Sequence, residues 1–344
     1  MREEGSTVKG PAITSAEGVE VLRAAGVEVS SGSVVVDLVP SGNAVHRLRS
    51  GEETFFVKVP AKDLEPWSDP IDGAAVKVSR EAAAAECLHR NGVAALEVLT
   101  TDTGTANPVG RPYLLSRAVD GAPFRGLMES SSRRDREALV AAVGGYLRHV
   151  HTIEFRASGY IVSADGPTGP TPPAPPRAAH DPKVAAADAL GDLAQARGRV
   201  DELVWWRAHE RLGSLSDRIS SEYEPPRFVM GGFHTNHPHL REVGGGWQVV
   251  GCVDLEVASG GRVLDDLVTF AADLMLEVGG AFEWWEPLFD GYGGEPPVDA
   301  VRDELLGSCV YLFGDRGDLT QTYRNLLDAS SWSELFSAHV SGGS

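Results

Sequence analysis

Two charged residues in the first third of the chain have the spacing of a phosphate-binding pair. Lys58 lies near the end of the apolar stretch 54–59, and Glu81 opens an alanine-rich stretch about twenty residues later. A lysine on an apolar strand can point its ammonium at a phosphate, and a glutamate on the next helix can hold that ammonium in place. Either residue alone reads as an ordinary surface charge, but the pair indicates a nucleotide site.

Acidic residues in the last third of the chain could complete such a site. Asp254 follows the β-branched run 249–253, where a carboxylate at the end of a buried strand could hold a hard cation that bridges phosphates. Asp266 lies at the start of a predicted helix over 265–278 and is expected to cap and orient a loop, a role that Asp265 could exchange with it.

The elements expected around these residues divide into a strand-rich first part and a helical second part. Alternating apolar residues and two turn signals predict three antiparallel strands within 34–59. The alanine-rich stretch 78–93 predicts a helix with Glu81 in its first turn and Gly92 just beyond its end. We predict further strands over 94–101, 111–119 and 247–254, and further helices over 132–150, 201–221 and 265–278. The pattern favours an α+β protein.

Composition limits the classes of function. With 344 residues, 42% of them apolar, the chain can bury one large core or two modest ones. It has no run long enough to span a membrane and no secretory leader, so we expect a cytoplasmic protein without a membrane partner. A net charge of −18 disfavours nucleic acid as a partner and favours cationic ligands, or serves solubility alone. Cys87, Cys252 and Cys309 lack metal-ligand spacing and are expected to be packed, reduced thiols.

The order of these parts resembles the aminoglycoside phosphotransferase and choline kinase-like family, over roughly residues 30–290. The resemblance implies a protein-kinase-like fold, with an N-terminal antiparallel sheet lobe, a mainly helical C-terminal lobe and a nucleotide bound between them. None of the motifs is specific alone, but together they are. The matching stretches are "VVVDLVPSGNAVHRL" (34–48), "FFVKV" (55–59), "SREAAAAECLHRNGV" (79–93), "GRPYLLSRAVDGAP" (110–123), "VGGYLRHVHTIEF" (143–155) and "VVGCVDLEVASGGRVLDDLVTFAADL" (249–274).

The resemblance also implies a division of the chain. Residues 1–29 would form an N-terminal extension with a helix, and 30–120 the nucleotide-binding lobe. Residues 121–344 would form the helical lobe, which carries the proline-rich insert 164–182 as a linker or lid.

ATP and Mg²⁺ are the cofactors that the resemblance implies. Lys58 would contact the phosphates, Glu81 would orient Lys58, and Asp254 would bind the metal. The hairpin that covers the nucleotide and the hinge that meets adenine would add Ser41, Gly42, Ser116 and Ala118 to the cofactor-binding residues.

The loop "MGGFHTNH" at 230–237 departs from the family's HGDFHxxN, in which the aspartate is the catalytic base and the asparagine a metal ligand. Met230 stands at the histidine position, Gly232 at the aspartate position and His237 at the asparagine position. His234 or His237 could accept the substrate proton in place of the aspartate. Alternatively, the loop histidines bind a transition metal together with His239, or they simply pack.

The sequence therefore leaves enzymatic activity open between two readings. In the first, the protein is an ATP-dependent phosphotransferase with an atypical loop, acting on a hydroxyl of a small molecule, cationic or not, or on a peptide serine or threonine. In the second, it is a pseudokinase, a nucleotide- or peptide-binding module that acts through a partner protein.

Overall fold

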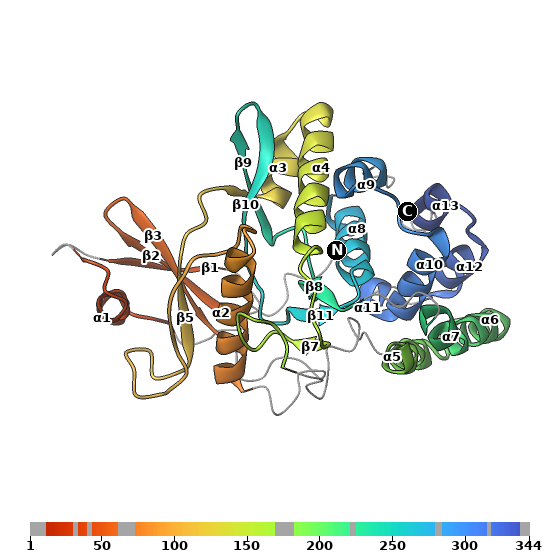
Figure 1. Cartoon of the computed structure of the whole chain (residues 1–344), viewed down its shortest axis with the longest axis horizontal. Helices are drawn as coiled ribbons and strands as arrows, with labels where there is room; N and C mark the ends of the chain where they lie inside the picture. The colour runs from red at the N-terminus through yellow and green to blue at the C-terminus, as the bar shows by residue number, and fades with distance from the viewer. Residues whose placement is uncertain are drawn as a thin grey trace. The chain divides into compact units, whose positions relative to one another are not determined.

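The computed structural model divides into two compact units (Figure 1). The first comprises residues 1–120 with the short segments 162–165 and 251–257, and the second comprises the rest of the chain. The structure describes residues 12–29, 34–39, 43–60, 73–168, 182–220, 225–278, 284–314 and 318–337.

Five antiparallel strands form the sheet of the first unit among its described residues, in the order β1-β2-β3-β5-β4. The strands are β1 (Val35–Val39), β2 (Ala44–Ser50), β3 (Glu53–Val59), β4 (Val98–Asp102) and β5 (Tyr113–Arg117). The strands predicted from the sequence are therefore confirmed. In this register Lys58 pairs with Val45 on one side and with Leu114 on the other, which places it in the middle of the sheet.

Two helices accompany this sheet. Helix α1 (Ser15–Ala24) begins with a capping box formed by Thr14 and Glu17. Helix α2 (Ala74–Arg90) starts earlier than predicted, so Glu81 lies in its interior and the prediction of a first-turn glutamate is wrong. Ala74, Ala75 and Lys77, which favour helix, extend the helix backward from Ser79.

The second unit is mainly helical. Among its described residues, short strands form two sheets of three, β10-β9-β6 and β7-β11-β8. Its helices are α3 (Phe124–Ser130), α4 (Arg133–Val150), α5 (Pro182–Gln195), α6 (Glu202–Gly213), α7 (Leu215–Ser220), α8 (Leu264–Val278), α9 (Trp285–Tyr292), α10 (Val298–Gly307), α11 (Cys309–Phe313), α12 (Thr320–Asp328) and α13 (Trp332–Ser337). Its strands are β6 (Ala122–Pro123), β7 (Gly159–Tyr160), β8 (Arg227–Val229), β9 (Pro238–Val243), β10 (Gly246–Cys252) and β11 (Ser259–Gly261); the last two residues of β10 belong to the first unit.

The α+β fold class is thus confirmed, with one correction in the helical part. The single helix predicted over 201–221 is two helices, α6 and α7, which meet at Ser214 directly after Gly213, a poor helix former. Most of the proline-rich insert 164–182 lies outside the described residues. The three cysteines are buried thiols and form no disulfide, as expected. In the part of the chain that the structure describes, no helix is both long and apolar enough to cross a membrane.

Helices α4 and α9 approach each other closely through glycine. A Cβ atom built on Gly144 would lie 2.1 Å from the carbonyl oxygen of Leu288, and one built on Gly291 would lie 2.0 Å from that of Ala141. Both obstacles are backbone atoms, which no side-chain rotation can move. The two glycines therefore allow this helix pair to form.

This contact predicts that Gly144→Ala destabilises the second unit. Overpacking typically costs about 1–3 kcal/mol, and we expect a loss of that size in the free energy of unfolding measured in urea. Gly145→Ala is the matched control, because a Cβ there meets the Gly291 carbonyl at an ordinary 3.7 Å. Alanine is favoured over glycine in a helix by about 1 kcal/mol, so the control should be unchanged or more stable. Equal destabilisation by both substitutions would contradict the close approach.

Candidate active site

Lys58 is the centre of a buried charge cluster in the first unit. Its Nζ lies 2.8 Å from Oε2 of Glu81 and 2.9 Å from Oε2 of Glu256, and it also pairs with Asp254. Glu81 comes from α2, whereas Asp254 and Glu256 come from the segment after β10. The structure therefore brings together the three residues that the sequence singled out and adds Glu256.

The cluster carries an excess of negative charge. Burial by itself would lower the pKa of Lys58, but Asp254, Glu81 and Glu256 together hold that pKa well above its ordinary value. Burial raises the pKa of Glu81; Lys58 acts against the rise, and the other two carboxylates add to it. One ammonium cannot neutralise three carboxylates. Lys77 adds a second ammonium, 3.5 Å from Oε1 of Glu256, and an excess of one negative charge still remains when all five groups are ionised.

This donor set fits a magnesium ion. Glu81, Asp254 and Glu256 each offer a carboxylate oxygen, and the three oxygens lie within 4.8 Å of one another. Oxygen ligands, carboxylates above all, are the ones that Mg²⁺ prefers. The side chain of Asp254 is 43% exposed and so can reach a ligand, whereas that of Glu81 is 3% exposed and faces Lys58.

The backbone at Asp254 is unusual. Its φ of 65° lies in the left-handed region, which residues other than glycine adopt uncommonly, although aspartate does so more often than most. The neighbouring chain is tied to the first unit, because the Leu96 amide donates to the Cys252 carbonyl at 3.0 Å. An observed outlier of this kind supports a functional role for the carboxylate that it aims.

Sequence reasoning missed Glu256 and Lys77. Glu256 accepts from Asn43 at 3.3 Å with the same oxygen that faces Lys58, and its other oxygen faces Lys77. The signals were present: Glu256 follows Asp254 by two residues, and Lys77 lies four residues before Glu81 on one face of α2. Their partners lie far away in the chain, which local patterns cannot reveal.

The altered loop in the second unit is held by Asp266. Its carboxylate accepts the amides of Met230 at 2.7 Å and Gly231 at 3.1 Å, and it lies 3.2 Å from Nε2 of His151. Asp266 is fully buried, so its contacts with these groups take the place of hydrogen bonds to water. The predicted orienting role of Asp266 is confirmed, and no exchange with Asp265 is needed.

The backbone of this loop requires glycine at the position of the family's aspartate. Gly231 has a φ of 69° and Gly232 a φ of 114°, and the second value is strained for any other residue. Space is not the limit, since among the described residues beyond its two neighbours a Cβ built on Gly232 would meet no atom closer than Nε2 of His234, at 4.0 Å. At position 232 the carboxylate is absent, and the backbone adopts a conformation that an aspartate would adopt only under strain.

One of the loop histidines, His234, contacts a residue that the sequence analysis did not select. Nδ1 of His234 lies 3.4 Å from Oδ1 of Asp273, and the Thr235 amide and hydroxyl both donate to Oδ2 of Asp273 at 2.7 Å. Asp273 follows Asp266 by seven residues on α8, two helical turns away on the same face. This spacing was the available signal.

The transition-metal interpretation of the loop histidines gains no support. Among the described residues, the group of side chains that could hold a metal ion is Glu81, Asp254 and Glu256, and the loop histidines are not part of it. Instead, the rings of His234 and His237 meet edge to face at a centroid distance of 5.3 Å. Burial lowers the pKa of His239, whose Nδ1 faces the His237 carbonyl.

The remaining predicted site residues are placed only in part. Ser41 and Gly42 lie outside the described residues. Ser116 is buried in β5, and the Ala118 amide donates to the Thr54 carbonyl at 2.9 Å, which extends the pairing with β3. That amide is committed to the sheet, so an adenine contact near Ala118 stays a prediction.

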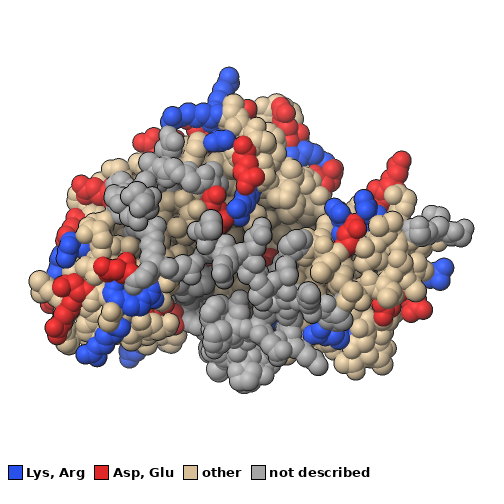
Figure 2. All heavy atoms as spheres, turned by 180° about the vertical axis from the view of Figure 1, so that it is seen from behind, with Lys and Arg blue, Asp and Glu red and all other residues tan. Residues whose placement is uncertain are grey.

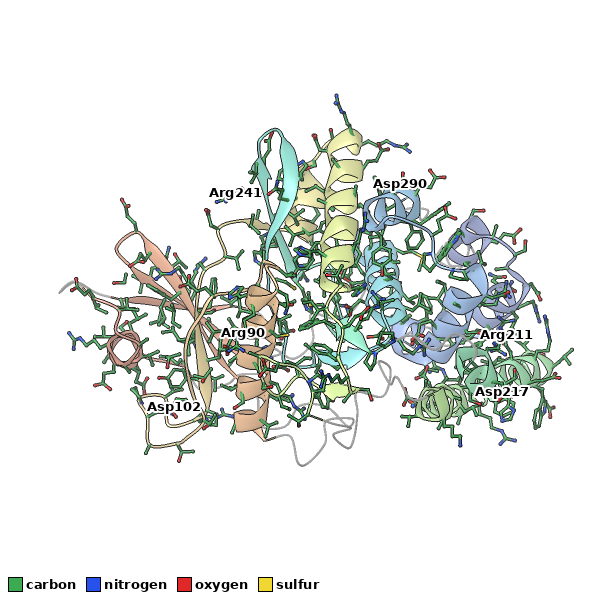
Figure 3. All side chains as sticks on the ribbon, viewed as in Figure 1. Arg90, Asp102, Arg211, Asp217, Arg241 and Asp290 are labelled. Carbon is green, nitrogen blue, oxygen red and sulfur yellow. The ribbon has the colours of Figure 1, made fainter. Side chains whose placement is uncertain are left out.

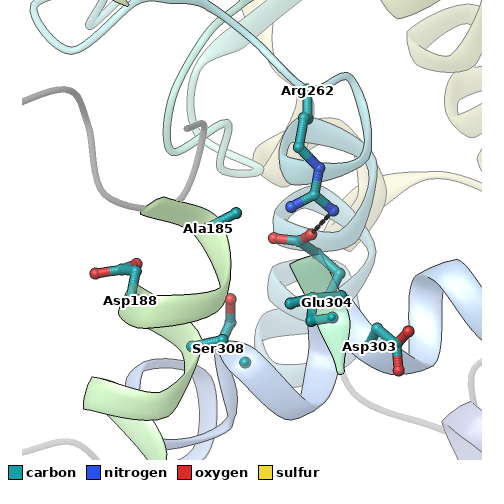
Figure 4. Close-up of a pocket in the computed structure, with 9 residues that line it drawn as sticks. Ala185, Asp188, Arg262, Asp303, Glu304 and Ser308 are labelled. Atoms are coloured by element: carbon teal, nitrogen blue, oxygen red, sulfur yellow. Dashed lines mark hydrogen bonds and ion pairs between the residues drawn. The ribbon is translucent and has the colours of Figure 1, made fainter. Parts of the chain in front are cut away.

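A second polar cluster lies in the helical unit, around a small cavity shown in Figure 4. Arg262 pairs with Glu304 at 2.6 Å, and Arg218 pairs with Asp303 at 2.8 Å. Arg211, labelled in Figure 3, also contacts Asp303. The cavity volume of about 20 Å³ holds about one water molecule, so we interpret this cluster as structural.

On the face shown in Figure 2, acidic and basic side chains lie interspersed over the described atoms. The Lys58 cluster provides a local attraction for cations, because its carboxylates outnumber its ammonium groups.

The arrangement of Lys58, Glu81 and Asp254 agrees with the protein family that the sequence matches. The model of the phosphotransferase enzyme family matches residues 40–302. The chain belongs to this family. No curated protein matches the chain.

Solved structures of aminoglycoside phosphotransferases share the fold of this phosphotransferase-family chain. The streptomycin–ATP ternary complex of APH(2″)-IIa matches 94% of each chain at 15% identity and a TM-score of 0.55. ADP-bound APH(2″)-Ib matches 93% of this chain and 98% of its own, at 14% identity and a TM-score of 0.54. The GDP complex of aminoglycoside 2′-phosphotransferase-IIIa matches 94% of this chain and 95% of its own, at 14% identity and a TM-score of 0.58. At these identities the likeness shows the protein-kinase-like fold.

Asp273 generates a prediction about stability and pH. Burial would raise its pKa, but the contacts from His234 and Thr235 lower the pKa from 3.8 to about 2. A carboxyl group with a lower pKa in the folded than in the unfolded chain stabilises the folded state at pH values above its pKa in the unfolded chain. This stabilisation is lost as the pH falls from about 4 to about 2. We expect Asp273→Asn to lower the free energy of unfolding by about 2 kcal/mol at pH 7. The free energies of unfolding of the variant and the wild type should become equal as the pH falls through this window.

The measurement is urea unfolding of both proteins between pH 7 and about pH 2. Asp290→Asn, at an exposed aspartate on α9 (Figure 3), is the control for the loss of one negative charge. A difference between Asp273→Asn and the wild type that stays constant over the whole range would contradict the assignment.

Proposed function

We propose that the protein is an ATP-dependent phosphotransferase that moves the γ-phosphate to a hydroxyl of a small molecule. The observation that carries the proposal is the ion pairing of Lys58 with Glu81 and Asp254. A buried lysine held by a helix glutamate and by a strand-end aspartate is the arrangement that phosphoryl transfer uses to position phosphates. The need for ATP agrees with the predicted cytoplasmic location.

Each residue of the cluster has a role in this proposal. Lys58 binds phosphate oxygens, and Glu81, buried beside it, holds the ammonium in position. Asp254 and Glu256 would hold Mg²⁺, which supplies positive charge to the phosphates when it is bound. Lys77 keeps the Glu256 carboxylate oriented, because it contacts the oxygen that faces away from Lys58. Phosphoryl transfer depends chiefly on such positioning and charge neutralisation.

The proposed acceptor is a cationic small molecule that bears hydroxyl groups. APH(2″)-IIa, a protein of similar fold, forms a ternary complex with streptomycin and ATP, which supports a small-molecule acceptor. The net charge of −18 favours a cationic over an anionic acceptor by attraction. A serine or threonine of a basic peptide is the second acceptor class to test.

One observation favours a pseudokinase instead. Gly232 occupies the position of the catalytic aspartate, and its backbone conformation is disfavoured for other residues. The retained Lys58 cluster is compatible with this alternative, since nucleotide binding alone would preserve it. General-base assistance is typically worth about 10²- to 10⁴-fold in rate, so loss of the aspartate slows transfer without abolishing it.

Transfer of label from γ-³²P-ATP separates the two functions. The acceptors are streptomycin, kanamycin, choline and a basic serine-containing peptide, each with Mg²⁺ present. We expect a labelled small molecule with the wild type and a loss of labelling with Asp254→Asn. Asparagine also tolerates a positive φ, so this substitution removes the charge while retaining the backbone.

Lys183→Ala, at an exposed lysine on α5, is the control for an unrelated charge change. Labelling that persists in Asp254→Asn would contradict the assignment of the Asp254 carboxylate to metal binding. An absence of labelled product and of ATP hydrolysis in the wild type would contradict the phosphotransferase proposal and favour the pseudokinase alternative.

A further inference from the structure

A histidine faces the place from which the family's catalytic aspartate would extend. The Cβ atom that Gly232 lacks would lie 4.0 Å from Nε2 of His234, and no other described atom outside the flanking residues lies as close to it. A side chain at position 232 would project from that Cβ, so Nε2 lies beside the space that such a side chain would enter. The side chain of His234 is 33% exposed, which leaves the ring accessible from solvent.

The other nitrogen of the same ring faces a carboxylate. Nδ1 of His234 lies 3.4 Å from Oδ1 of Asp273, whose side chain is 14% exposed. The contacts that lower the pKa of Asp273 to about 2 keep it ionised at neutral pH. An ionised carboxylate at Nδ1 favours the tautomer with its proton on that nitrogen, and this tautomer presents the Nε2 lone pair.

Helix α8 fixes both ends of this arrangement. Asp266 accepts the amides of Met230 and Gly231, before Gly232, and Asp273 accepts the Thr235 amide, after His234. Because the two aspartates are two turns apart on one rigid helix, the loop is held on either side of Gly232. Asp273 therefore positions the His234 ring, and the helix positions Asp273.

His237 is less suited to accept a proton. Its Nδ1 accepts the His234 amide at 3.4 Å. A neutral imidazole that accepts at one nitrogen carries its proton on the other, so Nε2 of His237 is a donor. Nε2 is therefore an acceptor in His234 and a donor in His237.

We infer that His234, oriented by Asp273, is the general base of this protein and replaces the carboxylate absent at Gly232. This inference rests on the proposed phosphotransferase function. The acceptor oxygen forms a bond to the γ-phosphorus of ATP while the bond from that phosphorus to the β,γ-bridging oxygen breaks, and ADP leaves. The hydroxyl proton moves to Nε2 of His234. The resulting imidazolium lies beside the Asp273 carboxylate and afterwards loses the proton to water.

Steady-state kinetics of His234→Gln test the inference. The probes are streptomycin as acceptor, and water as acceptor in the hydrolysis of γ-³²P-ATP. We expect kcat to fall by about 10²- to 10⁴-fold, with little change in the KM for ATP, because His234 is assigned to the proton and not to the nucleotide. His237→Gln, the matched control on the same loop, should lose far less.

Asp273 is a positioning residue, and its test needs a readout that a purely structural role would not move. Asp273→Asn should lower kcat without raising the KM for ATP, and Asp273→Glu should recover part of the loss because the carboxylate returns. Imidazole added to His234→Ala should restore part of the rate. Circular dichroism and urea unfolding identify any variant that fails to fold, and imidazole rescue then decides between loss of the base and loss of the loop.

The outcomes separate this inference from the proposed function. A wild type that transfers phosphate, together with a fully active His234→Gln, overturns the His234 assignment and leaves the phosphotransferase intact. Equal losses in His234→Gln and His237→Gln, with no imidazole rescue, also overturn it. A wild type that neither labels any of the four acceptors nor hydrolyses ATP overturns the phosphotransferase proposal and the general base with it.

Discussion

The site of the first unit depends on a single buried ammonium shared by several carboxylates. Lys58 comes from a central strand, Glu81 from α2, and Asp254 and Glu256 from a segment far along the chain. Removing one partner of a buried ion pair typically costs about 3–5 kcal/mol, because the other charge stays behind. The cluster therefore ties three parts of the unit together. Its excess of negative charge is also what makes a bound cation favourable.

In the second unit, helix α8 holds the loop 230–237, which has glycine in place of the family's catalytic aspartate. Helix α8 supplies two aspartates on one face, and each satisfies backbone amides of the loop. The glycine conformations between these points keep the loop open where a carboxylate would project. A kinase-like chain can therefore retain the scaffold of its catalytic loop while the chemical group within it changes.

Local patterns in the sequence predict the strands of the first unit and the candidates Lys58, Glu81 and Asp254, because strand alternation, helix composition and turn residues are local properties. The start of α2 was misjudged because Gly73 gives no side-chain cap, so Glu81 appeared to begin the helix. Glu256 and Asp273 were missed for a different reason. Their roles come from partners distant in sequence, and only tertiary packing brings those partners together.

The most direct test of the central claim is calorimetric titration of the protein with ATP, with and without Mg²⁺, for the wild type and Lys58→Met. The account predicts binding that strengthens with Mg²⁺ and is lost in Lys58→Met, with circular dichroism showing that the variant is folded. Binding of equal strength to both proteins, or no binding to the wild type, would contradict the assignment of the Lys58 cluster as a nucleotide site.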